Sequence, residues 1–189
     1  MAQKVWMITG ASRGFGAEIA NAVLAEGDKV IATARNEESL NHLDGHENIF
    51  KVALDVTRDP QVKKAVKAAL AHFGRIDVLV NNAGFGLLGA VEEGSRKEIE
   101  NIYRTNVFGL LNVTRGCCRA CASSAPAILS ICPRLRDSAR FQGGVCMPPQ
   151  NSRWKESRRR STESWRRWVF MSLQSSPDCS ERTFWIAVL

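Results

Sequence analysis

Residues 9–16 of this 189-residue chain read Thr-Gly-Ala-Ser-Arg-Gly-Phe-Gly, a glycine-rich turn that is the strongest fold signal in the sequence. It follows a short apolar run, residues 4–9, and precedes residues 19–23, where the apolar side chains have helical spacing. The order is therefore strand, tight turn, helix. In an α/β domain, a turn of this kind is where a dinucleotide's phosphates bind.

The three glycines of this turn have separate roles. Gly10 permits the tight turn, Gly14 lets the backbone approach a pyrophosphate, and Gly16 allows close helix packing. The N-terminus of the helix adds unpaired N–H groups that attract an anion. An ordinary strand-to-helix turn is the alternative, and the surrounding elements favour the phosphate site.

Two arginines indicate which nucleotide the site prefers. An NAD site places a carboxylate at the end of the second strand, but here that strand ends at Arg35. A guanidinium there suits a 2′-phosphate, and Arg13 in the glycine turn supplies a second positive charge. The sequence therefore favours NADP over NAD, with two solvated surface charges as the alternative.

The first 115 residues alternate short apolar runs with helical patterns. We expect further strands at residues 28–34, 49–54 and 75–80. Strands that alternate with helices imply right-handed crossovers and a parallel sheet covered on both faces. The predicted class is therefore an α/β fold with a doubly wound parallel sheet.

Two of the helices have clear boundary signals. One should begin with Asp59 as N-cap and Pro60 at its first position, and end at Gly74. The other should begin at a capping box formed by Ser95 and Glu98.

Four motifs in order resemble those of the short-chain dehydrogenase/reductase family. They are T-G-x-x-x-G-x-G at residues 9–16, Leu-Asp-Val at 54–56, Asn-Asn-Ala-Gly at 81–84 and Asn-Val-Phe-Gly at 106–109. The resemblance covers residues 4 to about 115. It implies a Rossmann-type enzyme that moves hydride between NAD(P) and an alcohol or carbonyl.

The resemblance also implies roles for individual residues. Asp55 and Val56 would border the adenine, residues 82–84 would line the cofactor floor, and Asn106 would be the asparagine of a catalytic Asn, Ser, Tyr, Lys tetrad. For Asn106 the alternative is a helix-interior amide that bonds its own backbone. The expected cofactor-binding residues are Gly10, Ser12, Arg13, Gly14, Phe15, Gly16, Arg35, Asp55, Val56, Asn82, Ala83 and Gly84.

The family's chemistry needs a tyrosinate as acid/base, a lysine four residues later and a serine that polarises the carbonyl. This chain has one tyrosine, Tyr103, with Val107 four residues later, and the only lysine beyond it is Lys155. Tyr103 precedes Asn106, and we interpret it as a helix packing residue. The catalytic tyrosine and lysine are missing.

The composition changes abruptly after residue 115. Residues 1–115 hold 14 basic and 14 acidic residues, whereas residues 116–189 hold 12 and 5 and carry the entire net charge of +7. We therefore divide the chain into a partial NAD(P)-binding domain, 1–115, and a tail, 116–189. We expect the sheet to be truncated to four strands and the tail to be irregular and poorly ordered, although residues 127–131 are apolar enough to add a strand.

A shifted reading frame explains this break. If the gene lost one base, or gained two, near codon 115, the ancestral frame starts at the third base of each present codon. In that frame, residues 146–152 can encode Y-A-x-x-K-F, residues 130–133 can encode N-L-S-S, and residues 176–179 can encode P-G-L. One offset thus restores the missing family elements in order.

Three functions remain open. The first is an NADP-dependent oxidoreductase by descent, inactive in this translation, whose intact relatives take a small alcohol or carbonyl substrate. The second is a non-catalytic nucleotide-binding protein. The third is a binding module built on the Arg- and Trp-rich residues 153–168.

Several partners and locations are not expected. A shifted frame accounts for the basic tail, so we do not expect nucleic acid. The cysteines lack the paired spacing of a metal site, so we expect no metal. No apolar run approaches the roughly 20 residues that span a bilayer, so we expect a cytoplasmic protein without a membrane partner. We do not carry the family's homo-oligomer over to this chain.

Overall fold

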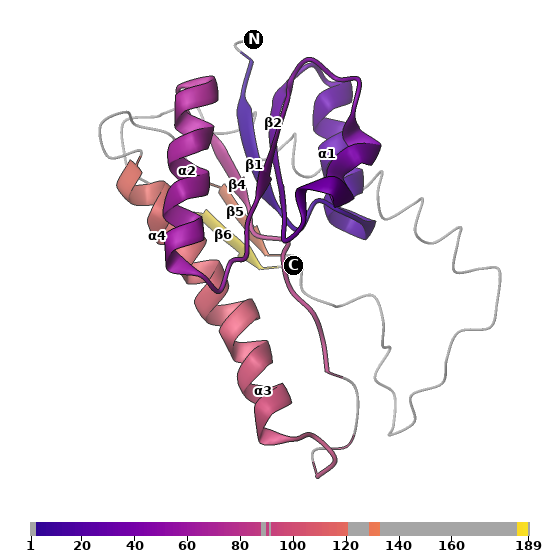
Figure 1. Cartoon of the computed structure of the whole chain (residues 1–189), viewed down its shortest axis with the longest axis vertical. Helices are drawn as coiled ribbons and strands as arrows, with labels where there is room; N and C mark the ends of the chain where they lie inside the picture. The colour runs from indigo at the N-terminus through magenta and orange to yellow at the C-terminus, as the bar shows by residue number, and fades with distance from the viewer. Residues whose placement is uncertain (1–2, 88–89, 91, 121–128, 133–184, 189) are drawn as a thin grey trace, which may run out of the picture. The chain divides into compact units, whose positions relative to one another are not determined.

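The computed structural model describes residues 3–87, 90, 92–120, 129–132 and 185–188. They belong to one compact unit, formed by residues 1–134 and 182–189, and they contain a six-stranded parallel sheet of order β3-β2-β1-β4-β5-β6 (Figure 1). The strands are β1 Val5–Thr9, β2 Lys29–Ala34, β3 Ile49–Ala53, β4 Val78–Val80, β5 Leu129–Cys132 and β6 Trp185–Val188.

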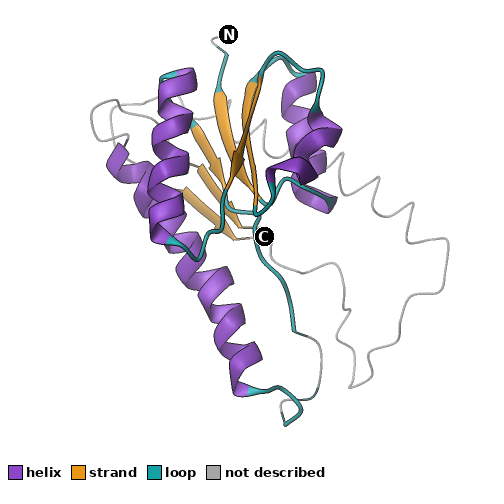
Figure 2. Ribbon diagram, in the orientation of Figure 1, coloured by secondary structure: helices purple, strands orange, loops and turns teal. Residues whose placement is uncertain are grey.

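Helices cover both faces of this sheet. Helix α1 lies on one face, and α2 and α4 lie on the other (Figure 2). The helical segments are α1 Gly14–Ala25, the 3₁₀ helix η1 Glu37–Leu43, α2 Asp59–Phe73, α3 Arg96–Tyr103, the π-helix η2 Arg104–Gly109 and α4 Leu110–Ala120. The predicted doubly wound α/β fold is confirmed.

The strand order reverses between β1 and β4. Successive strands β1, β2 and β3 extend the sheet in one direction, and the chain then returns to pair β4 with the other side of β1. In open α/β sheets, ligands bind outside the carboxyl ends of the strands at such a switch point. The glycine turn after β1 and the Asn-Asn-Ala-Gly turn after β4 therefore meet at the expected site.

The core explains why β1 and β2 read as continuous apolar runs. Every residue of β1 is buried, and so is every residue of β2 after Lys29, because helices cover both faces. On the α2 and α4 side, strand residues Met7, Ile31 and Leu79 share one buried cluster with Val66 and Val113.

The helix boundaries agree with the sequence except at one residue. Gly74 ends α2 in the left-handed conformation with φ of 77°, and the capping box of Ser95 and Glu98 is present. The predicted N-cap Asp59 is wrong, because the non-helical residue is Arg58 and Asp59 is the first residue of the helix. An acidic side chain in the first turn is still favourable beside the positive end of the helix dipole.

Two features differ from the expected half-domain. The helix after Ser95 is not uniform, because a π-helix interrupts it at Arg104–Gly109. The sheet continues beyond the four expected strands. Strand β5, which pairs with β4, overlaps the apolar residues 127–131 that could add a strand, whereas β6, which pairs with β5, was not expected. Most of the predicted tail, including residues 133–184, lies outside the described residues. None of the helices in the described ranges is long and apolar enough to cross a membrane.

Candidate nucleotide-binding site

Thr9, the last residue of β1, joins the glycine turn to the end of β4. Its Oγ1 accepts hydrogen bonds from the backbone N–H groups of Asn82 and Ala83, both at 3.0 Å, and donates one to the Val80 carbonyl at 3.2 Å. These three bonds use the full capacity of a hydroxyl. Thr9 opens the T-G-x-x-x-G-x-G motif, but its sequence context alone suggested no role for it beyond being the polar residue that ends an otherwise apolar strand.

The side chain of Asn82 holds the glycine turn from the other side. Its Nδ2 donates to the carbonyls of Thr9 and Gly10, at 3.0 and 2.9 Å. A Cβ on Gly16 would lie 2.4 Å from this Nδ2 and 2.3 Å from the Gly10 oxygen. Gly16 therefore makes room for the contact between Asn82 and the turn, which is a more specific role than close helix packing.

Gly10 and Gly14 both need the left-handed backbone region. Their φ angles are 68° and 58°, which side chains rarely tolerate. A Cβ on Gly10 would lie 3.0 Å from the Cα of Ala83, whereas one on Gly14 would meet open space. The turn is thus packed at Gly10 and open at Gly14, where the N-terminus of α1 begins.

The two arginines lie at the same edge of the sheet. Arg13 directly precedes α1 and Arg35 directly follows β2, and β1 and β2 end side by side with Thr9 paired to Thr33. Both arginines are exposed, and neither takes part in an ion pair or hydrogen bond among the residues that the structure describes. Their charges are available to an anion at this edge. Ser12 and Phe15, also in the turn, are half-buried.

Asp55, just beyond β3, is held as a carboxylate. Thr57 donates two hydrogen bonds to Asp55 Oδ1, from its backbone N–H at 3.0 Å and from its Oγ1 at 2.7 Å, and Arg58 Nε lies 3.6 Å from Oδ2. Burial is the largest single effect and raises the pKa of Asp55. The two hydrogen bonds, with the charges of Arg58 and Arg35, outweigh it and hold the pKa below its usual value.

Val56, the next residue, connects this edge to the long helix. It is buried, and a Cβ on Gly109 would lie 2.6 Å from Val56 Cγ2. The glycine of the Asn-Val-Phe-Gly motif therefore allows the helical segment to contact the end of the β3 region.

Asn106 lies in the π-helix and binds the loop that follows β4. Its Oδ1 accepts a hydrogen bond from the Phe85 N–H at 3.1 Å, and its Nδ2 donates to the Phe85 carbonyl at 2.7 Å. A Cβ on Gly84 would lie 3.0 Å from the same Oδ1. The amide is therefore paired with a different segment and does not bond its own helix. π-helical turns often occur at functional sites.

The interpretation of Tyr103 as a packing residue is wrong. Its side chain is 58% exposed, and helix α3, which it ends, has no buried residue. Lys155 and residues 146–152 lie outside the described part of the chain. The structure thus joins Gly10, Gly16, Asn82 and Ala83 through direct contacts and brings Asn106 to Gly84.

The match to known proteins covers the same region. A family model for short chain dehydrogenases matches residues 4–134, and the chain therefore belongs to the short-chain dehydrogenase/reductase family. Within that family it is 47% identical over 115 residues to oxidoreductase BOA17 of Botryotinia fuckeliana, an alignment that covers 59% of this chain and 42% of the relative. The chain thus spans about two fifths of the length of this relative.

Solved structures show the same similarity. A short-chain dehydrogenase from Streptomyces avermitilis superposes with a TM-score of 0.64 and 38% identity, over 69% of this chain and 49% of the other. The protein ElxO, solved with NADP bound, superposes with a TM-score of 0.63 and 31% identity, over 69% and 55%.

We expect Asn82→Ala to lower the free energy of unfolding by about 1–3 kcal/mol, because two backbone carbonyls lose their donor. Denaturant titration followed by circular dichroism measures the change. The matched control is Asn21→Ala, an exposed asparagine on α1, which should stay within about 0.5 kcal/mol of the parent chain. Equal destabilisation by the two substitutions would show that the Asn82 amide does not hold the turn.

The lowered pKa of Asp55 predicts a pH-dependent contribution to stability. The ionised carboxylate stabilises the fold above its ordinary pKa of 3.8, and this contribution is lost as the pH falls through the lower pKa of the folded chain. The stability advantage of the parent chain over Asp55→Asn should therefore be full near neutral pH and should shrink below pH 3.8. Thr57→Val, which removes one hydrogen bond to Oδ1, should reduce this pH dependence. An advantage that grows on acidification would contradict the assignment.

Proposed function

We propose that this chain binds NADP(H) at the carboxyl ends of β1, β2 and β4. The observation that carries the proposal is the glycine turn, which Thr9 and Asn82 hold in place while Gly14 faces open space. A phosphate-binding turn needs this combination of a fixed backbone and an unobstructed helix N-terminus. The NADP in the solved ElxO structure supports the same nucleotide.

Each part of the nucleotide has a candidate group. The N–H groups at the start of α1 would bind the pyrophosphate, and that helix has no acidic residue in its first turn to oppose it. Arg13 and Arg35 would flank the 2′-phosphate as charge-assisted donors. Asp55 and Val56 would border the adenine, and residues 82–84 would line the floor of the site.

By descent, the proposed activity is hydride transfer between NADP and a small alcohol or carbonyl compound. Bound NADPH would supply the hydride, and a proton must then reach the alkoxide oxygen. Asn106 is an amide and cannot supply it, and Tyr103 has no lysine four residues later. We therefore propose that the chain binds the nucleotide without turning over substrate.

The proposed origin of this state is a shifted reading frame near codon 115. The abrupt change in charge after residue 115 supports it, as does the recovery of Y-A-x-x-K-F at residues 146–152 in the alternative frame. A second candidate is a catalytically silent nucleotide-binding protein whose function is to be recognised by a partner. The intact glycine turn and the missing tyrosine and lysine favour this candidate as well. A role for the basic residues 153–168 concerns residues outside the described ranges.

NADP should bind more tightly than NAD, and Arg35→Ala should remove most of the difference. A lost charge-assisted hydrogen bond is worth about 1.5–3 kcal/mol, which corresponds to roughly a 10- to 100-fold change in affinity. Calorimetric titration with both nucleotides measures it. Arg96→Ala, an exposed arginine on α3, is the matched control and should leave both affinities unchanged. Equal binding of NADP and NAD, or a preference that survives in Arg35→Ala, would refute the role of this arginine.

The chain should reduce no carbonyl compound with NADPH, whereas the gene with its frame restored near codon 115 should encode an active enzyme. A positioned acid/base contributes roughly 10²- to 10⁴-fold to rate, and the only tyrosine in the sequence has no lysine four residues later. The assay follows NADPH absorbance against a panel of carbonyl compounds for the present chain, its Tyr103→Phe variant and the restored protein. Turnover by the present chain that is lost in Tyr103→Phe would make Tyr103 catalytic. An inactive restored protein that still binds NADP would count against the frameshift.

A further inference from the structure

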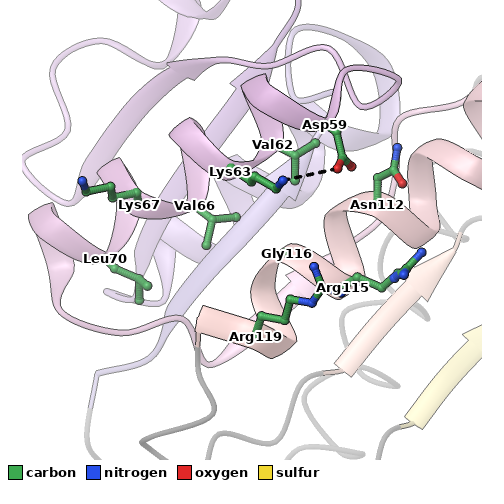
Figure 3. Close-up of a pocket in the computed structure, with 10 residues that line it drawn as sticks. All are labelled: Asp59, Val62, Lys63, Val66, Lys67, Leu70, Asn112, Arg115, Gly116 and Arg119. Atoms are coloured by element: carbon green, nitrogen blue, oxygen red, sulfur yellow. Dashed lines mark ion pairs between the residues drawn. The ribbon is translucent and has the colours of Figure 1, made fainter.

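A basic groove of about 610 Å³ lies between α2 and α4, and the proposed nucleotide site does not use it (Figure 3). Four of its ten lining residues are cationic, Lys63 and Lys67 on α2 and Arg115 and Arg119 on α4, whereas one, Asp59, is acidic. The groove therefore carries a strong positive charge.

The cations form one row along each helix. Both pairs are four residues apart, so successive charges on each rim are separated by about one helical turn, roughly 6 Å. The helices approach closely between the rows, because a Cβ on Gly116 would lie 2.9 Å from Val62 Cγ1. Positive charge thus lies on both helices that border the groove.

Most of this charge is uncompensated. Lys63 pairs with Asp59 at 3.7 Å. Lys67, Arg115 and Arg119 are exposed, and none of the three forms an ion pair in the part of the chain that the structure describes. A negatively charged ligand would meet three free cations.

The two valines of the groove offer little apolar surface to a partner. Val62 and Val66 are already 2% and 3% exposed, so covering them removes almost no apolar surface from water. Leu70 also lines the groove and is half-buried, so a partner could cover part of its side chain. A second copy of the chain that docked by the same surface would place the basic rows against each other.

The splay of the cations favours an extended partner over a small anion. Lys67 and Arg115 do not point toward one another across the groove (Figure 3), so their charges are spread along the groove and do not converge on one point. Among the described residues, no aromatic side chain lines the groove, so those residues offer unstacked bases no platform. A helix with acidic residues every four positions repeats its charge at the same interval as each rim.

We propose that the α2 and α4 groove is a docking site for an acidic helix of a partner protein. In the chain as translated, carboxylates one turn apart on that helix lie against Lys67 on one rim and against Arg115 and Arg119 on the other. Of these three cations, only Arg119 lies beyond the proposed frame change near codon 115. The helix-in-groove arrangement is a general mode of peptide recognition, and here opposite charge replaces the usual apolar anchors.

The test uses the full chain and a fluorescent synthetic helix with glutamate at every fourth position, followed by anisotropy at low and physiological salt. The variant is Lys67→Glu with Arg119→Glu. Its matched control is Lys64→Glu with Arg104→Glu, which makes the same change in charge at exposed residues that do not line the groove. We expect affinity about tenfold weaker or more in the groove variant and within about twofold in the control, with affinity falling as salt rises.

Circular dichroism checks that both variants fold. If the charge-reversal variant does not fold, Lys67→Gln with Arg119→Gln replaces it, and we expect this variant to weaken binding about threefold. An equal loss of peptide affinity in the groove variant and in the control would show that the acidic peptide is attracted by the overall charge of the chain, which would overturn the proposal. A single-stranded oligonucleotide or tripolyphosphate could also displace the peptide. If this displacement required Lys67 and Arg119, the groove would be assigned to those anions instead. A dimer in sedimentation that the groove variant dissolves would assign it to a second copy. NADP binding should not change in any of these variants, which separates this test from that of the nucleotide site.

Discussion

The hydrogen bonds between Thr9 and the end of β4 are the constraint on which the described domain depends. The hydroxyl of Thr9 binds two backbone N–H groups of the Asn82 turn, and the Asn82 amide binds back to the carbonyls of Thr9 and Gly10. Thr9 is buried and Asn82 is half-buried, so a broken bond would leave a partly buried polar group without a partner, which costs stability. The reciprocal arrangement fixes the glycine turn at the point where the strand order reverses. The glycines, which have no side chains, then leave the backbone N–H groups of this turn open to a ligand.

Charge is distributed unequally around this fixed turn. Asp55 is a carboxylate whose hydrogen-bond partners are supplied by its own loop, through Thr57. Arg35 contributes to the low pKa of Asp55 yet forms no close pair with it among the described residues. One edge of the sheet therefore offers both a fixed anion and two exposed cations. An arrangement of this kind can bind a ligand that carries a polar ring at one end and phosphate at the other.

The long helical segment connects this site to the groove between α2 and α4. At its π-helical turn, Asn106 forms hydrogen bonds with the backbone of Phe85, and the absence of a side chain on Gly109 leaves room for Val56. Helix α4, which is eleven residues long, follows and packs against α2. The absence of a side chain on Gly116 lets the two helices come into contact. Because Gly109 and Gly116 are small, one continuous helical segment can contact the proposed nucleotide site and also form one wall of the basic groove.

The sequence by itself determined the class of fold, the position of the glycine turn and the family. These depend on local patterns: Gly10 and Gly14 need positive φ, Gly74 ends a helix, and Ser95 with Glu98 begins another, each through neighbours in the chain. Tertiary structure alone decided what these residues contact. The bonds from Asn82 to Gly10 span 72 residues, and the exposure of Tyr103 depends on what packs against its helix, so no local pattern encodes either. The same is true of the two basic rows, because Lys67 and Arg119 become neighbours only when parallel strand pairing brings α2 and α4 onto one face of the sheet.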